Sequence, residues 1–194
     1  QKPLVVMLDR DALPDVELLR LSQQGVAAAV VNVRGQGELA VERDFHYIQN
    51  NIILMAPMLV HRAFDLHQTT MALRRHAPER PIALVARGQS DALIGLVAQA
   101  LWLDFDKVFI DGVMGSWMDA FGKTFPAEGY VHRILHLADI PHFIELARER
   151  PLRVIQNKAR SLKKHWPKWA EHQSEVLLRR LPSDSETIEW LKSP

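Results

Sequence analysis

The feature that most limits the possible folds of this chain is an alternation between short apolar runs, rich in Val and Ile, and longer amphipathic stretches. This alternation is typical of a parallel sheet whose strands are buried on both faces and connected by helices. We therefore predict an α/β fold, a three-layer sandwich built on a mostly parallel, doubly wound sheet of about six strands. The strand candidates are residues 3–8, 26–33, 81–86, 107–113, 151–156 and 175–181.

Helical signals lie between these runs. Residues 14–24 begin with Pro14 and stop at Gly25, a good helix terminator. Residues 58–76 follow Pro57 and carry one apolar stripe at spacings of three and four. Residues 92–101 are almost wholly apolar, so we expect them to form a helix buried against the sheet. Two further helices are predicted within 139–151 and 183–191, the second capped by Ser183 or Ser185.

Composition limits the class of protein. A chain of 194 residues with 47% apolar content has enough material for one well-filled core, so we predict a single domain over residues 1–194. Its 24 basic and 23 acidic side chains give no global attraction to nucleic acid. Without cysteine, disulfides and thiolate chemistry are excluded. No apolar run reaches the ~20 residues of a membrane span, so we expect a soluble domain. The immediate entry from Gln1 into a strand predicts a processed piece of a longer chain.

Four segments, in the same order and at similar spacing, resemble the α/β-hydrolases of the acetyl xylan esterase and prolyl-oligopeptidase-like type. The segment VVNVRGQGEL resembles the D-x-R-G-x-G turn of that family. The other three, in chain order, are residues 61–101, 105–121 and 132–155. The resemblance covers most of the chain and implies an α/β-hydrolase-like sheet. In an active member it would also imply ester hydrolysis by a serine, a histidine and an acid.

The elbow that would carry the serine has two registers in VARGQSDAL, residues 85–93. If the strand ends at Val85, Gly88 takes the place of the nucleophile, flanked by Gln89, and a glycine cannot attack a carbonyl. The other register makes Ser90 the nucleophile, but it extends the buried strand to Arg87 and puts Asp91 where an oxyanion donor is needed. We favour the glycine register, in which Ser90 is an ordinary helix-capping residue.

The other parts that the resemblance implies also differ. An acid is expected after the strand at 151–156, yet Gln156, Asn157, Lys158 and Arg160 stand there. A histidine is expected after the last strand, yet Ser183 and Asp184 occupy that stretch and the last histidine, His172, precedes it. The turn after the first strand reads Asp9-Arg10-Asp11 in place of a glycine-rich donor loop. Without a base, a serine hydroxyl is not activated.

Histidines offer an alternative chemistry. His132, His136 and Asp139 have the spacing of zinc ligands on one helix. Pro141 interrupts that helix before His142, and no H-E-x-x-H arrangement is present, so we favour a solvated or capping role. The histidines at 61, 67 and 76 fit the polar edge of the helix at 58–76.

Three groups of residues are candidates for binding. Residues 157–169 interleave basic and aromatic side chains, among them Lys163, Lys164, Trp166 and Trp169, which would suit an anionic polymer. A solvated helix face with buried tryptophans explains the same pattern, and we favour it. Trp117 and Trp102 are expected near the carboxyl edge of the sheet, where open α/β sheets bind ligands. Arg34, in the R-G-Q-G turn, is a further candidate.

The leading hypothesis is a catalytically inactive α/β-hydrolase-like domain that serves as a binding or assembly module. The alternative is a serine hydrolase of acetyl or other carboxylic esters that uses Ser90, and a third possibility is a metal enzyme at His132, His136 and Asp139. The leading hypothesis requires no cofactor. It predicts a protein partner or a parent-chain domain, with a polysaccharide or an ester as possible ligand, and no nucleic acid and no membrane span. The resemblance slightly favours an exported or periplasmic location.

Overall fold

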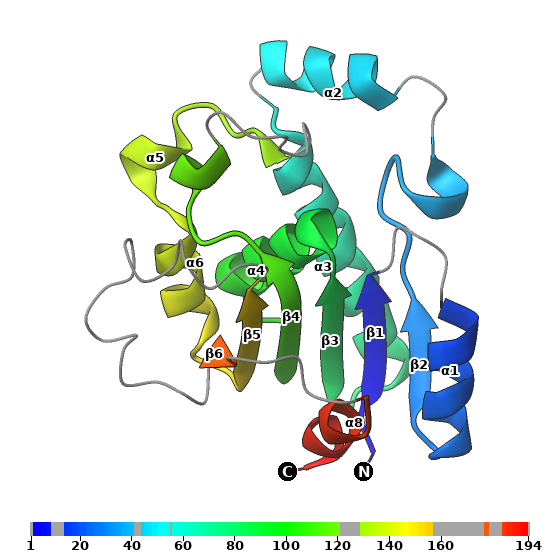
Figure 1. Ribbon diagram of the computed structural model, residues 1–194. Helices are drawn as coiled ribbons and strands as arrows, with labels where there is room; N and C mark the ends of the chain where they lie inside the picture. Colours follow the sequence, from blue (N-terminus) through cyan, green and yellow to red (C-terminus); the bar gives the residue numbers. More distant parts are fainter. Residues whose placement is uncertain are drawn as a thin grey trace.

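A six-stranded parallel sheet forms the centre of the computed structural model, which describes residues 2–8, 14–40, 44–54, 56–120, 129–156, 177–178 and 184–193 (Figure 1). The strands are β1 (Leu4–Leu8), β2 (Ala27–Val30), β3 (Ile82–Arg87), β4 (Lys107–Val113), β5 (Leu152–Gln156) and β6 (Leu177–Leu178). The longer helices are α1 (Pro14–Gln23), α2 (Asp44–Ile53), α3 (Met58–His76), α4 (Gln89–Trp102), α6 (Ile140–Ala147) and α8 (Asp184–Lys192). Short helical turns are η1 (Gly37–Leu39), η2 (Trp117–Ala120) and α5 (Ile134–Leu137).

The strands lie in the order β2-β1-β3-β4-β5-β6, and every neighbouring pair is parallel. The chain therefore builds the sheet outward from β1 in both directions, first to β2 and then to β3. Such a reversal is a topological switch point, where the loops leaving two adjacent strands diverge and leave room for a ligand. The carboxyl ends of the strands point upward in Figure 1, toward α2 and α5, and we call this side the carboxyl edge.

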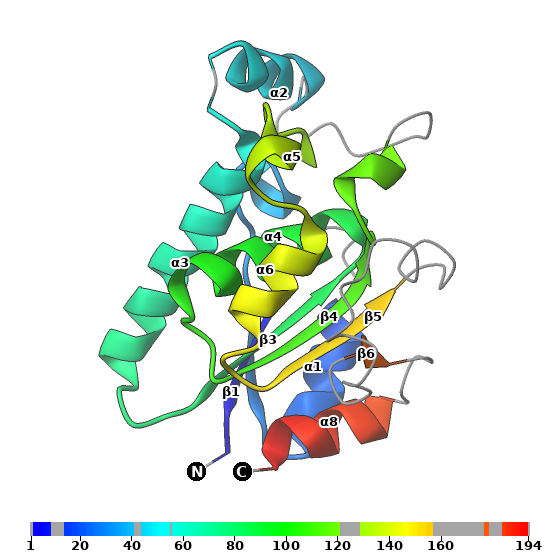
Figure 2. The same ribbon diagram turned by 90° about the vertical axis from the view of Figure 1, so that its left-hand side faces the viewer.

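Helices cover both faces of the sheet. Figure 2 shows α3, α4 and α6 on one side and α1 and α8 on the other. In β3, Leu84 and Ala86 belong to the core beneath α3, α4 and α6, whereas Ala83 and Val85 belong to the core beneath α1 and α8. Burial on both faces explains why these strands are continuous apolar runs and not alternating ones.

The predicted three-layer α/β fold is confirmed, and several elements match closely. The fourth predicted strand, 107–113, has the bounds of β4, and the predicted helix at 58–76 has the bounds of α3. The helix predicted for 92–101 is buried from Asp91 to Gln99, as expected, but it begins earlier, at Gln89. The strand predicted for 26–33 is limited to Ala27–Val30, and α2 was not predicted.

Candidate functional site

The turn between β3 and α4 lies at the switch point, and Gly88 forms it. Gly88 has φ +81° and ψ 158°, a conformation that is essentially restricted to glycine, and α4 begins at the next residue. The register that we favoured, with Gly88 at the turn, agrees with this geometry. The strand end assumed for it, Val85, is wrong by two residues because Arg87 still pairs in register with Asp111 of β4.

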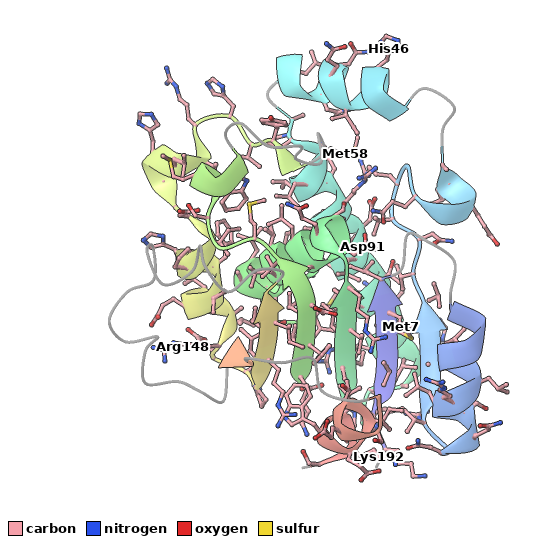
Figure 3. All side chains as sticks on the ribbon, viewed as in Figure 1. Met7, His46, Met58, Asp91, Arg148 and Lys192 are labelled. Carbon is pink, nitrogen blue, oxygen red and sulfur yellow. The ribbon has the colours of Figure 1, made fainter. Side chains whose placement is uncertain are left out.

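Ser90 is consequently the second residue of α4, in its first turn, and it is half-buried. The residue after it, Asp91, is buried, and its carboxylate accepts a hydrogen bond of 2.9 Å from Nε2 of Gln36. Figure 3 places Asp91 at the start of α4, above the end of β3. This position sets a carboxylate in the first turn of a helix, where it interacts favourably with the helix dipole.

None of the residues that the structure describes fills the space next to Gly88 into which a side chain would point. A Cβ atom built on Gly88 meets no described heavy atom within 4 Å. The neighbouring strand approaches from the side, because a Cβ atom on Gly112 would lie 3.3 Å from the carbonyl carbon of Gly88. Gly112 has φ +96° and lies where the pairing of β4 with β5 shifts register between Asp111 and Val113, so glycines with positive φ stand side by side here.

Arg87 and Asp111 place opposite charges beside this turn. Both side chains are half-buried. Burial raises the pKa of Asp111 above its ordinary value, and the positive charge of Arg87 offsets part of that rise. A carboxyl group with a perturbed pKa at a switch point is a common feature of functional sites, although structural ion pairs produce the same effect.

The loop at residues 34–37, which follows β2, is fixed by side chains of α3. Asp65 accepts hydrogen bonds from the Arg34 guanidinium at 2.7 and 2.5 Å, and a third from the Arg34 backbone N–H at 3.1 Å. Nδ1 of His61 lies 3.3 Å from the same guanidinium. Arg62 is fully buried and donates to the carbonyl oxygens of Arg34 (2.9 Å) and Gly35 (3.4 Å).

These contacts determine what Arg34 can do. Burial alone would raise the pKa of Asp65, but the hydrogen bonds and charge of Arg34 outweigh it and lower that pKa. Two guanidinium nitrogens of the binding candidate Arg34 are therefore engaged in the internal ion pair with Asp65, which fixes the loop. Its side chain is 36% exposed, so one edge of it still reaches the surface.

Trp117 is a core residue, which corrects its prediction as a surface for ligands. It is buried, its ring packs edge-on against Phe143 at 5.6 Å, and its Nε1 donates to the carbonyl oxygen of Gly129 at 3.1 Å. The large ring belongs to the core beneath α6. The buried indole N–H has its hydrogen-bond partner in the backbone of Gly129.

Trp102 is also not where we expected it. It is the last residue of α4, and a helix that connects two parallel strands runs back toward their amino ends. Its ring stacks on His67 of α3 with centroids 4.8 Å apart, and Nδ1 of His67 lies 2.5 Å from Asp104. Trp102 and His67 thus fasten α3 to the end of α4, away from the carboxyl edge.

The proposed zinc ligands are not brought together on one helix. The helix α5 spans only Ile134–Leu137, so His132 precedes it, and Asp139 is the N-cap of α6. The Asp139 carboxylate accepts hydrogen bonds from the hydroxyl of Ser116 and from the backbone N–H of Trp117, the latter at 2.8 Å. Among the described residues, no three His, Asp or Glu side chains are grouped so as to hold a metal ion.

Ser116, Asp139 and His142 are three residue types of a catalytic triad, but their order differs. The serine contacts the carboxylate directly, whereas Nδ1 of His142 accepts a hydrogen bond of 3.0 Å from the backbone N–H of Asp139. No imidazole therefore stands between hydroxyl and acid, and Ser116 is fully buried. The arrangement is a capping box for α6.

Several predicted positions lie outside the described residues. They are the oxyanion-loop candidates Asp9-Arg10-Asp11, the triad positions Asn157, Lys158, Arg160, His172 and Ser183, and the basic-aromatic candidates Lys163, Lys164, Trp166 and Trp169. Gln156 is the last residue of β5, and Asp184 is the first residue of α8. The residue at the end of β5, next to the position where the resemblance implies an acid, is therefore a glutamine.

Sequence reasoning missed the polar partners on α3 and β4. From the sequence, His61 is assigned to the polar edge of the helix at 58–76, and no role is predicted for Asp65 or Asp111. A lone carboxylate inside the run KVFIDGV was the available signal, since an unpaired charge is rarely placed in a buried strand. The partner of Asp111, Arg87, is the last residue of β3, which lies next to β4 in the sheet.

Comparisons with known proteins add no family to this picture. No family model matches the chain, and no curated protein matches it either. In the part of the chain that the structure describes, no helix combines the length and the apolar character needed to cross a membrane. The class that the fold itself defines is a three-layer α/β domain with a parallel sheet.

Proposed function

We propose that the chain is a catalytically inactive α/β-hydrolase-like domain that acts as a binding or assembly module. The observation that carries the proposal is Gly88 at the summit of the turn after β3, where a hydrolase of the resembling family would hold its nucleophile. The strand order β2-β1-β3-β4-β5-β6 fits the doubly wound sheet that the proposal requires.

The surroundings of Ser90 also favour this function over ester hydrolysis. Ser90 lies inside the first turn of α4, followed by the buried Asp91 carboxylate. A negative charge beside the serine would repel a developing oxyanion, which needs hydrogen-bond donors. The histidines at 61, 67 and 142 have hydrogen-bond partners elsewhere, in Arg34, Asp104 and the Asp139 backbone.

A binding role agrees with how the carboxyl edge is built. The loop 34–37 is fixed to α3 and α4 by Arg34, Arg62 and Gln36, so the surface beside the turn is preorganised. Preorganised loops lose little conformational entropy when a partner binds. The class of partner that we propose is another protein or another domain of the parent chain.

The test treats the protein with a fluorophosphonate probe and with p-nitrophenyl acetate, beside the Ser90→Ala variant. We expect equal and negligible labelling and turnover for both proteins. A second variant, Gly88→Ser, puts a hydroxyl at the summit of the turn and stays unlabelled if base and acid are missing too. Circular dichroism verifies that each variant is folded.

Labelling of the protein that is lost in Ser90→Ala would establish the esterase alternative in place of this proposal. Labelling of Gly88→Ser alone would show that a base is still present at the edge. In that case only the nucleophile has been lost.

A further inference from the structure

Strand β2 lies at one edge of the sheet, and its outer side is only partly covered in the part of the chain that the structure describes. All four residues of Ala27–Val30 are half-buried, whereas the neighbouring β1 is fully buried from Val5 to Leu8. Edge strands are usually protected from pairing with foreign strands by charged residues, proline or a β-bulge. The sequence of β2 contains no charge and no proline, and its pairing with β1 is regular over all four residues.

The hydrogen bonds of the parallel ladder show which backbone groups of β2 point outward. Met7 of β1 is opposite Val30, and its carbonyl oxygen accepts the backbone N–H of Val31 at 2.9 Å. In a parallel ladder, a residue bonds to the two neighbours of the residue opposite it, so Ala29 and Val31 point inward to β1. The alternate residues, Ala28 and Val30, therefore present their N–H and C=O groups to the outside.

The outward groups of Ala28 and Val30 have no hydrogen-bond partner among the residues that the structure describes. The outward position before them differs, because the N–H of Val26 donates to the carbonyl oxygen of Leu21 in α1 at 2.9 Å. Two donors and two acceptors thus remain in one row, with a spacing of two residues. Such a row is complementary to the backbone of another extended chain.

The side chains of β2 leave room for those of an added strand. Ala28 and Val30 pack against the core beneath α1 and α8, so the alternation along a strand places Ala27 and Ala29 on the opposite face. Alanine covers little surface on either face. An added strand with β-branched or aromatic side chains would cover these half-buried alanines through cross-strand contacts.

The geometry of the edge selects the kind of partner. A helix uses its backbone groups internally, so it cannot satisfy the outward groups of β2. A second copy of the chain would have to bring its own β2 alongside by a twofold rotation that keeps both copies of α1 on the same face of the sheet. Figure 1 shows that α1 extends outward past β2, so the two copies of α1 would meet before the strands could pair. The edge therefore fits a single extended segment.

We propose that the outer edge of β2 binds an extended, apolar segment of a partner polypeptide as an additional strand of the sheet. The N–H groups of Ala28 and Val30 donate to carbonyl oxygens of this segment, and their C=O groups accept its N–H groups. α1, which extends past β2, then covers one face of the added strand. This attachment rests on the binding role that we propose for the domain, and it does not involve the turn at Gly88.

Peptide selection and amide exchange test the proposal on the full chain. The probe is a phage-displayed library of random peptides of about 12 residues, longer than a typical strand. We expect the selected peptides to be rich in β-branched and aromatic residues and to lack proline in their central part. By NMR, the amides of Ala28 and Val30 should exchange rapidly in the free protein and become protected when a selected, synthesised peptide binds. The amide of Ala29 should be protected in both states.

Proline at an outward position removes a donor without breaking the ladder to β1. Ala28→Pro should weaken peptide binding about tenfold, because one hydrogen bond is lost and the ring obstructs the added strand. Ala28→Ser keeps the N–H and is the matched control, which should change the affinity by less than about twofold. Ala29→Pro removes an inward donor, so it should lower the melting temperature more than Ala28→Pro does.

Four results would overturn the proposal. They are a library that yields no binder, peptides that bind the parent protein and Ala28→Pro equally, binding without protection of the Ala28 and Val30 amides, and a dimer in sedimentation equilibrium that Ala28→Pro abolishes. The dimer would identify a second copy as the occupant of the edge. If Ala28→Pro does not fold, amide exchange in the parent protein decides. Fluorophosphonate labelling at Ser90 bears on the proposed function alone, so the two failures can be told apart.

Discussion

The Arg34 guanidinium and the Asp65 carboxylate form a two-point ion pair, with N···O distances of 2.7 and 2.5 Å, across 31 residues of sequence. The pair joins the loop after β2 to the middle of α3. Since Asp65 also accepts the Arg34 backbone N–H, three hydrogen bonds at one carboxylate determine the path of this loop.

Asp65→Asn should destabilise the protein at neutral pH by about 1–2 kcal/mol, the usual effect of losing a charge-assisted, partly exposed pair. Because the pKa of Asp65 is lowered in the folded state, its contribution is present above the unfolded pKa and is lost as the pH falls through the folded one. The difference from the parent protein in urea unfolding should therefore shrink in acid. Glu189→Gln, which removes the exposed pair with Lys192, is the control and should cost under about 0.5 kcal/mol.

Asp111→Asn should stabilise the protein at neutral pH, whereas Asp65→Asn should destabilise it. Burial raises the pKa of Asp111 in the folded state, with partial compensation from Arg87, so stability falls as the pH rises from the unfolded pKa through the folded one. The amide keeps the shape and removes the ionisation, and we expect a gain of up to about 1 kcal/mol at neutral pH that vanishes below about pH 4. A loss of stability at neutral pH would mean that attraction to Arg87 outweighs the cost of burial.

Gly88→Ala should cost about 1–3 kcal/mol in chemical denaturation, through backbone strain alone. The new methyl group meets no described atom within 4 Å, so no packing defect is expected. Gly95→Ala is the comparison, because its Cβ would lie 2.9 Å from the Ala86 Cβ in the core and would cost a similar amount through overpacking. An unchanged stability of Gly88→Ala would show that the turn relaxes to another conformation.

Lys107→Met should loosen the end of α8. The buried ammonium group of Lys107 donates to the carbonyl oxygens of Trp190, at 3.0 Å, and Ser193, and to the Ser193 hydroxyl at 2.8 Å. Methionine keeps the volume but donates nothing, so Trp190 should become more accessible to acrylamide quenching and the melting temperature should fall by a few degrees, roughly. Equal quenching in both proteins would show that packing alone holds the helix.

Much of the fold could be predicted from sequence because buried segments can be recognised by their pattern of apolar residues. The runs at 107–113 and 58–76 coincide with β4 and α3, since one is mostly apolar and the other carries an apolar stripe. The end of β3 could not be predicted, because Arg87 is polar by composition yet continues the ladder opposite Asp111. Charge pairing across strands is a tertiary property, and the local sequence does not contain it.

The candidate site was predictable in part for the same reason. Gly88 was recognised at the turn from its place between a buried strand and a buried helix. The roles of Asp139 and Trp117 were not, because His132, His136 and Asp139 suggest one helix until Pro141 and the cap at Asp139 divide it. A tryptophan near a ligand edge and a tryptophan that closes a core also look identical in sequence.

The second core has a consequence for any shortened version of this chain. Ile188 and Leu191 of α8 pack on Val5, Val85 and Phe109, residues from three strands at the middle of the sheet. A fragment that stops before Asp184 would expose these apolar side chains of β1, β3 and β4 to solvent. Such a fragment would be prone to aggregate in solution, so expression trials should keep the last helix.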